Sequence, residues 1–483
     1  MANTSRHRTL GNRLIRIFIK SVLFLLLFLL IIVLLIMTPP VQRFLKNKVV
    51  AYLENKLDTE VSIGSVYIGL PKKVIIKNLY LEDRHKDTLA SVGNLEVDIA
   101  LTKLIFKNEI RINTIYLSNS TLKVKRQLPD TSFNFQFIVD AFGGTDTTTV
   151  TDTTAQVISI NKISLDNIRC VYKDVVTGND AVVQFAHFST RLGKIAPEKM
   201  QFEIPETRLV GLVADIVQTK PLTKPETLAE DKIEASEPSP LALDFESIDL
   251  EDIRLNYRND ASATYAQVAF EGLEITMNDL DLQHRTIAID RLLLNNSNIA
   301  FRLGKKQAAE VVAKEAAKEI ETRADAGWRF LADEITIDNN FLRFDNDNDP
   351  PLKYGMDYSH LKADDLDLSI ENFIFSDDST GGTIKSASFK EKSGFVLNEL
   401  QADFLYSGTR AYLKNLYIET PGTVLKRKAA IAYSSIESII DNPGMLYVDA
   451  DISNSRIRVK DILTFVPALR STPAFSNANA TLL

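Results

Sequence analysis

The sequence predicts a mainly β protein, in which an N-terminal transmembrane helix is followed by an elongated, curled antiparallel β-sheet groove with a short helical insertion. Three observations predict this fold. Residues 22–37 are apolar throughout, and together with Ile17 to Ser21 they give about the 20 residues that cross a bilayer. From Val61 onward, apolar and polar residues alternate with a period of two, as they do in strands with one apolar face. A strand–corner–strand unit also recurs along the chain.

The composition is that of a large folded protein without basic character. The chain has 483 residues, 45% of them apolar and 25% charged, so it is long for one domain and too apolar to be disordered throughout. Its net charge of −7 gives no indication of nucleic-acid binding, and we expect no nucleic-acid partner. The single cysteine, Cys170, cannot form an internal disulfide, so packing and backbone pairing must hold the fold.

The first forty residues are typical of an uncleaved membrane anchor. Residues 1–20 form a basic tail without acidic side chains, and residues 21–40 form the predicted span, which Thr38-Pro39-Pro40 ends. The apolar run exceeds the roughly 7–15 residues of a signal-peptide core, and no small-residue cleavage site follows it. The positive-inside rule places the tail in the cytoplasm and the bulk of the chain across the membrane. The anchor residues that we single out are Val22, Leu26, Leu30, Leu34 and Met37.

Residues 41–58 predict an amphipathic helix directly after the anchor. Its apolar residues recur at helical spacing; they are Val41, Phe44, Leu45, Val49, Tyr52, Leu53 and Leu57. Such a helix can cap the first strands of the sheet or lie on the membrane surface. The first interpretation is favoured.

Alternating segments over 59–218, 241–303 and 328–483 predict three stretches of the groove, and we expect the last to be truncated. Short polar breaks between the strands suit an antiparallel meander. One face of each strand is apolar. The residues predicted to line the groove are Leu95, Val97, Ile99, Leu101, Ile110, Ile112, Ile115, Leu117, Leu243, Leu250, Ile253, Leu255 and Tyr257.

The recurring unit has an Asn or Asp corner between two short strands. Residues 165–172 (LDNIRCVY) resemble residues 250–257 (LEDIRLNY), with a third copy at 337–344 and shorter versions at 117–124 and 294–301. Asn and Asp suit a corner because they tolerate left-handed backbone dihedrals and can bond their own backbone. Repetition at this scale indicates stacking along an axis rather than one round core.

Three segments interrupt the strands. Residues 143–156 are a low-complexity run, which predicts a loop, and the Pro-rich residues 219–240 predict a linker or insertion. Residues 304–327 predict a helical insertion, because most of them form helices well and two pairs of opposite charge lie four residues apart. We expect this helix to cover the sheet.

The sequence offers no residues for catalysis or metal binding. It contains none of the common phosphate-binding, nucleophile or zinc motifs. The run Asp345-Asn-Asp347-Asn-Asp349 resembles the start of a calcium loop, but Pro350 stands where that loop needs glycine. Cys170 lies in a strand pattern and is interpreted as a structural thiol. We therefore expect no enzyme activity, cofactor or metal.

An antiparallel sheet with one apolar face must cover that face. A second sheet could cover it and make a dry sandwich. Alternatively, the sheet could curl into an open trough covered by lipid tails, because exposing an acyl chain to water costs about 0.8 kcal/mol per methylene. The sequence favours the second arrangement because a membrane-anchored protein lies close to lipid.

The N-terminal residues resemble a known family. The basic start, the apolar span, Pro39-Pro40-Val41-Gln42 and the segment 58–66 (DTEVSIGSV) are similar to the N-terminal region of AsmA/TamB-like proteins. Residues 81–89 and 128–135 resemble the Bacteroidetes branch of TamB, and the similarity is clearest over about residues 10–140. Further along, Ser455-Arg456-Ile457 and Asp461-Ile462-Leu463 are looser matches.

This resemblance implies an inner-membrane anchor, a periplasmic β-groove ("β-taco") and a part in phospholipid transport to the outer membrane of a Gram-negative envelope. The implied partners are phospholipid, the inner membrane and an outer-membrane β-barrel protein of the Omp85 type. The alternative is a translocation and assembly factor, which aids insertion of outer-membrane proteins by presenting a β-edge as a template.

Overall fold

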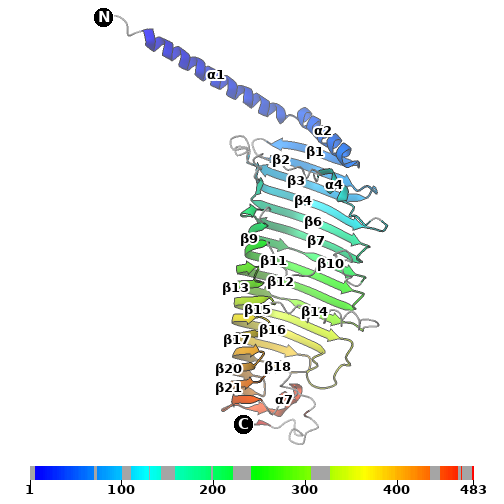
Figure 1. The fold of residues 1–483 in the computed structure, drawn as a ribbon, viewed down its shortest axis with the longest axis vertical. Coiled ribbons are helices and arrows are strands. Elements are labelled where there is room, and N and C mark those ends of the chain that lie inside the picture. The colour runs from blue at the N-terminus through cyan, green and yellow to red at the C-terminus, as the bar shows by residue number, and fades with distance from the viewer. Residues whose placement is uncertain are drawn as a thin grey trace, which may run out of the picture. The chain divides into compact units, whose positions relative to one another are not determined.

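A computed structural model of the chain describes residues 6–69, 73–100, 110–129, 131–142, 158–196, 200–220, 241–305, 327–435, 446–465, 469 and 481–482. The chain is mainly β with one long apolar N-terminal helix, as predicted (Figure 1). It divides into two compact units, which are Met1–Lys123 with Asn134–Ile160 and Val124–Phe133 with Asn161–Leu483.

The first unit contains two consecutive helices, a four-stranded meander and a short third helix. Its elements are α1 (Arg6–Ile36), α2 (Pro39–Leu57), β1 (Val61–Gly69), β2 (Lys73–Glu82), β3 (Thr88–Ile99), β4 (Ile110–Arg126), α4 (Gln136–Phe142) and β5 (Ile158–Ile160). The last residues of β4, from Val124, belong to the second unit. α1 begins inside the predicted basic tail and ends before Thr38, and α2 starts at Pro39 because proline is well tolerated at the first helical position.

The second unit is built almost entirely from strands that follow one another in chain order (Figure 1). They are β6 (Lys162–Asp174), β7 (Asn179–Arg191), β8 (Ile195–Ala196), β9 (Gln201–Val210), β10 (Val213–Gln218), β11 (Ala242–Asn259), β12 (Thr264–Asp281), β13 (Thr286–Asn295), β14 (Asn298–Leu303), β15 (Arg329–Asn346), β16 (His360–Phe375), β17 (Ser379–Glu391), β18 (Val396–Leu397), β19 (Glu399–Ser407), β20 (Arg410–Glu419), β21 (Val424–Ala432) and β22 (Tyr447–Asp451). A pair of two-residue strands, β23 (Ile457–Arg458) and β24 (Thr481–Leu482), accompanies helix α7 (Val459–Phe465).

The prediction of an antiparallel sheet throughout is wrong, because strands run parallel to their neighbours at three places. β5 runs parallel to β4, the broken strand β9–β10 runs parallel to β11, and the broken strand β13–β14 runs parallel to β15. Parallel neighbours need a crossover connection of about a dozen residues or more. The three interrupting segments lie within those connections. Residues 143–157, 221–240 and 306–326 of these connections lie outside the described residues, and so do all of the predicted loop and most of the predicted linker and helix.

The predicted corners are confirmed as left-handed residues, although most of them lie inside continuous strands rather than between strands. Four of these residues have φ between 51° and 54° and lie within a strand that continues past them. They are Asn119 in β4, Asn167 in β6, Asp252 in β11 and Asn339 in β15. Asn296, with φ 51°, separates β13 from β14. A single left-handed residue turns the strand locally without ending the ladder.

In each unit these residues line up across neighbouring strands and form what we call the crease. In the first unit Asn119 lies opposite Gly93, because the flanking pairs are Val92 with Ser120 and Asn94 with Ser118. In the second unit, Asn296 Nδ2 donates to Glu271 Oε2 at 2.6 Å and Asn339 Nδ2 donates to Asn296 Oδ1 at 2.5 Å. The crease divides the strands of each unit into two arms.

The crease explains why residue 93 is a glycine, and a first prediction follows from it. A Cβ at Gly93 would lie 2.9 Å from Asn119 Cβ and 3.0 Å from its carbonyl oxygen, closer than non-bonded atoms pack. Gly93→Ala should therefore lower the free energy of unfolding by about 1–3 kcal/mol, measured by denaturant unfolding of the detergent-solubilised chain. Gly408→Ala is the matched control, because its Cβ would meet nothing within 4 Å. Equal stabilities of the two variants would contradict the crease packing.

Candidate functional site

The candidate site is an apolar face of the second unit, formed where strand register aligns apolar side chains into rows. One row, which we call the Leu250 row, lies on one side of the crease and crosses nine strands. Its members are Leu165, Phe188, Leu209, Leu250, Leu273, Leu294, Ile337, Leu368 and Ala387. The nine strands have eight gaps, so at about 4.8 Å per gap the row spans roughly 38 Å.

Two further rows lie on the other side of the crease. The Leu255 row consists of Cys170, Val183, Ala214, Leu255, Val268, Ile299, Leu342 and Ala363. The Tyr257 row consists of Tyr172, Ala181, Ile216, Tyr257, Ala266, Phe301, Phe344 and Leu361. The two rows are separated by one residue in every strand, so they share a face of the sheet.

These three rows are only partly covered by protein. Their fully buried members are two alanines, Ala214 and Ala387. The others are half-buried, and two are more exposed, since Leu342 keeps 42% and Phe301 keeps 37% of its surface. A second sheet packed about 10 Å away would bury such central positions. The rows are therefore not the inside of a dry sandwich.

The structure describes most of the residues predicted from the sequence to line a groove. In the first unit, Leu95 pairs with Leu117, Val97 with Ile115, and Ile99 with Ile112, so six of them share one face of β3 and β4. In the second unit the described candidates lie on β11, where Ile253 is buried and Leu243, Leu250, Leu255 and Tyr257 are half-buried. Leu101 and the side chain of Ile110 lie outside what the structure describes.

One end of the apolar face in the second unit is filled by protein. Met356, Ala387, Phe395 and Leu397 form a buried cluster against which Leu361 and Leu368 pack from opposite sides of the crease. Both arms therefore present their apolar residues to the same space there. Phe465 of α7 closes this cluster, with its ring 4.7 Å from that of Phe395 in an edge-to-face arrangement. We call this assembly the plug.

Hydrogen bonds from both ends of α7 hold it in the plug. The Thr420 and Thr423 hydroxyls donate to Asp461 Oδ2 at 2.7 and 2.6 Å, and the Met356 backbone N–H donates to the Thr464 carbonyl at 2.7 Å. A seven-residue helix has little stability alone. These contacts therefore determine whether α7 stays folded.

Asp461→Ala should free α7 from the plug. Removal of an acceptor of two hydroxyl groups costs about 1–2 kcal/mol, so amide hydrogen exchange in α7 should accelerate roughly tenfold, while exchange in β11 stays unchanged. Lys460→Ala, at an exposed neighbouring position, is the control. Unaltered exchange in Asp461→Ala would show that packing alone holds the helix.

Beyond the plug the sheet has a second apolar hollow, of about 360 Å³. It lies over β19 to β22. Its small residues are Ala411, Ala429 and Ala430, and its larger ones include Phe404, Leu413 and Val448. The sequence interpretation missed this hollow. Phe404 and Tyr406, like Ala429 and Ile431, lie two residues apart, and this spacing was a usable signal of a shared face.

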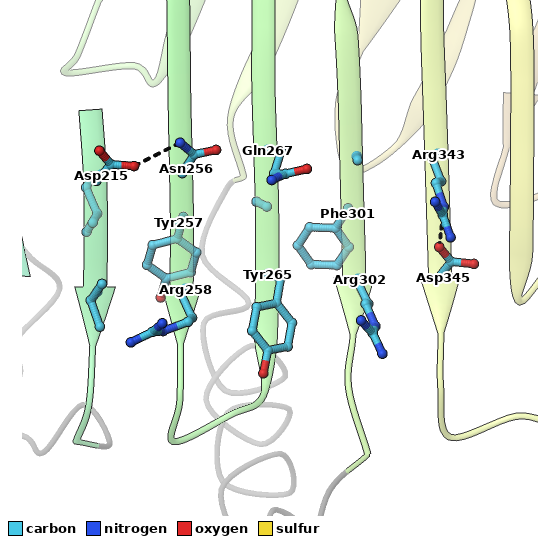
Figure 2. A pocket seen from close by; sticks show the side chains of 14 residues that line it. Asp215, Asn256, Tyr257, Arg258, Tyr265, Gln267, Phe301, Arg302, Arg343 and Asp345 are labelled. Carbon is cyan, nitrogen blue, oxygen red and sulfur yellow. Dashed lines mark hydrogen bonds and ion pairs between the residues drawn. The ribbon is translucent and has the colours of Figure 1, made fainter. Parts of the chain in front are cut away.

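A pocket of about 480 Å³ crosses β10, β11, β12, β14 and β15 (Figure 2). Two mostly polar rows form its walls. They are Asp215, Asn256, Gln267, Ala300 and Arg343, and Val217, Arg258, Tyr265, Arg302 and Asp345. The Tyr257 row runs between them, and its members Ile216, Tyr257, Ala266 and Phe301 also line the pocket. By strand alternation, this row belongs to the opposite, apolar face.

The arginines of this pocket are paired with acids. Arg302 pairs with Asp347 at 2.6 Å and lies over the Tyr265 ring at 5.9 Å, Arg343 pairs with Asp345 at 2.6 Å, and Arg258 with Asp260 at 3.1 Å. The pocket is thus a charge-balanced hollow of the polar face rather than an anion site.

An ion pair near the start of the second unit joins Arg126 to Asp174. Arg126 donates two hydrogen bonds to the carboxylate of Asp174, which is fully buried. The Arg126 guanidinium holds the pKa of Asp174 well below its usual range, and hydrogen bonds from Thr177 and Tyr172 act in the same direction. Sequence reasoning missed this pair because its members lie 48 residues apart.

The predicted anchor is one helix with exposed apolar side chains. The stretch Arg16–Ile36 has a mean hydropathy of 3.2 and is long enough to cross a membrane. Val22, Leu30 and Leu34 are exposed, Met37 is half-buried, and the side chain of Leu26 lies outside the described part.

Among the described residues, no three His, Cys, Asp or Glu side chains gather where they could hold a metal ion. The Asp345–Asp349 run forms the end of β15 and its turn, in which Asn346 Nδ2 donates to Asp349 Oδ2 at 2.8 Å. Neither a family model nor a curated protein matches this chain.

Proposed function

We propose that this chain is an inner-membrane-anchored periplasmic protein whose apolar face shields lipid acyl chains, and that it supports phospholipid transport to, and biogenesis of, the outer membrane. One observation carries the proposal. The Leu250, Leu255 and Tyr257 rows are unbroken across eight or nine strands and are left half-exposed. A hydrocarbon chain is the occupant that such rows suit best.

The physical basis is removal of hydrocarbon from water. An acyl chain in water costs about 0.8 kcal/mol per methylene, or about 10 kcal/mol for a long chain. Contact with the rows offsets most of this cost, and neighbouring positions along a row are chemically alike. A lipid can then move from strand to strand without a large barrier, while its headgroup remains in water.

The anchor and the N-terminal residues support the location and the family. A span preceded by a basic tail favours a cytoplasmic N-terminus with the bulk in the periplasm. The resemblance of residues 10–140 to AsmA/TamB-like proteins points to the same compartment and to a barrel partner of the Omp85 type.

Site-specific photocrosslinking in the envelope tests the proposal. A benzophenone side chain at Leu255 should capture phospholipid at least ten times more often than one at Asn256, its neighbour on the polar face. Val97 and Glu96 make the same comparison in the first unit. Phospholipid adducts are counted by mass spectrometry. Equal capture from both faces, or from the polar face alone, would refute a lipid-binding apolar face.

A second candidate function is assembly of outer-membrane proteins by β-edge templating. β22 favours it, because among the described strands only β21 pairs with β22, and Tyr447 and Val448 are 70% and 61% exposed. An exposed strand edge can pair with an incoming strand. Crosslinkers at Val448 would then capture client proteins, and templating without lipid binding would leave Leu255 without captured lipid.

A further inference from the structure

Helix α2 has two sides with apolar residues, and one of them packs on the sheet. Leu53 and Leu57 lie four residues apart and so face the same way. Leu57 is 3% exposed in a cluster with Val61, Leu89 and Phe137, and Leu53 packs against that cluster. This side explains how α2 caps the first strands, as the sequence predicted.

The other side of α2 is exposed and alternates aromatic and basic residues. Phe44, Lys48, Tyr52 and Lys56 recur every fourth residue and form one stripe along the helix, which we call the Phe44 stripe. Phe44 is 59% and Tyr52 is 58% exposed. Lys48 Nζ lies 5.7 Å from the centroid of the Phe44 ring. Capping the sheet does not require these residues, because they face away from it.

The charge of α2 is opposite to that of the whole chain. The helix contains Arg43, Lys46, Lys48 and Lys56 against one acid, Glu54, which gives it +3, whereas the chain carries −7. Anionic lipid headgroups attract such a helix. Aromatic rings prefer the boundary between headgroups and tails, and lysines can extend along them to the phosphates.

The position of α2 in the chain brings it to a membrane surface. Only Met37 and Thr38 separate α1, the helix able to span a bilayer, from the start of α2. We propose that the Phe44 stripe docks on the anionic headgroup surface of the membrane that α1 spans, so that α2 binds lipid on one side and the sheet on the other. This inference rests on the anchor of the proposed function but not on lipid transport.

Depth-dependent quenching of a single tryptophan in the full chain tests the docking. Trp328 is replaced by phenylalanine, and one tryptophan is placed by Tyr52→Trp, Glu54→Trp or Leu30→Trp. Each chain is reconstituted in vesicles of phosphatidylcholine with phosphatidylglycerol, all with brominated acyl chains. Glu54 is exposed two residues from Tyr52 and away from the stripe, and loss of its charge would only favour anionic lipid, which makes it a strict control.

We expect quenching at position 52 to exceed that at position 54 at least twofold, with strong quenching at position 30. Lys48→Glu with Lys56→Glu should at least halve the quenching at position 52, as should pure phosphatidylcholine vesicles. Equal quenching at 52 and 54 with strong quenching at 30 would overturn the docking and leave the anchor standing. No quenching at 30 would overturn both. Quenching at 52 that ignores headgroup charge would also overturn the proposal.

Discussion

Replacement of Leu255, Val268 and Ile299 together by aspartate is expected to reduce the phospholipid that co-purifies with the chain at least tenfold. The three residues are consecutive members of the Leu255 row, on β11, β12 and β14. A carboxylate there must lose its water to let an acyl chain pass. A penalty of about 1.4 kcal/mol already lowers occupancy tenfold, and the triple substitution places a charge on three consecutive strands of the row.

The matched control changes the opposite face of the same strands. Asn256, Gln267 and Ala300 form a cross-strand row in the polar pocket, each one residue from the positions above. Their triple replacement by aspartate adds equal charge but should leave bound lipid unchanged. Lipid is measured by mass spectrometry of extracts from the purified full chain, and folding is checked by circular dichroism. Equal lipid loss in both triples would show that added charge, and not the apolar face, determines the amount bound.

Local backbone geometry was the most predictable part of the fold. The Asn and Asp corners follow from one physical fact, which is that these residues tolerate left-handed dihedrals. Their positions at Asn167, Asp252 and Asn339 needed no knowledge of the partner strands. The repeat even continues past the predicted unit, since Asp174, Asn259 and Asn346 each follow the aromatic by two residues and accept a backbone N–H of the next turn.

Long-range pairing was less predictable. An apolar alternation is the same in parallel and antiparallel strands, so only the lengths of the connections could have indicated the parallel pairs. The rows depend on register, which each strand obtains from its neighbours. Leu250 and Leu294 could be assigned to apolar faces from the sequence, but not to one continuous row. The plug was unpredictable for the same reason, because Phe395 and Phe465 lie 70 residues apart and meet only in the folded unit.

Asp174→Ala is expected to destabilise the second unit by about 3–5 kcal/mol, the largest loss of stability among these predictions. The substitution leaves the Arg126 guanidinium, which is only 20% exposed, without its carboxylate. It also removes the acceptor of the Val176 and Thr177 backbone N–H groups, which shape the turn after β6. Urea unfolding of the full chain at neutral pH measures the difference from the unchanged protein. Asp249→Ala is the control, because its pair with Arg208 is solvent-exposed and should contribute less than about 1 kcal/mol.

The pH dependence separates the charge of Asp174 from its packing. In the unfolded chain this carboxyl has a pKa of about 3.9. In the folded unit, Arg126 holds the pKa of the Asp174 carboxyl well below this value. A lowered folded-state pKa adds stability that is complete above the unfolded value and is lost as the pH falls toward the folded one. The stability gap between the unchanged protein and Asp174→Asn should therefore be constant from pH 7 to about 5 and shrink below about 4. A gap that stays constant down to pH 3 would mean that the pair stabilises the turn through shape and hydrogen bonds alone, because asparagine keeps the acceptor oxygen but cannot carry the charge.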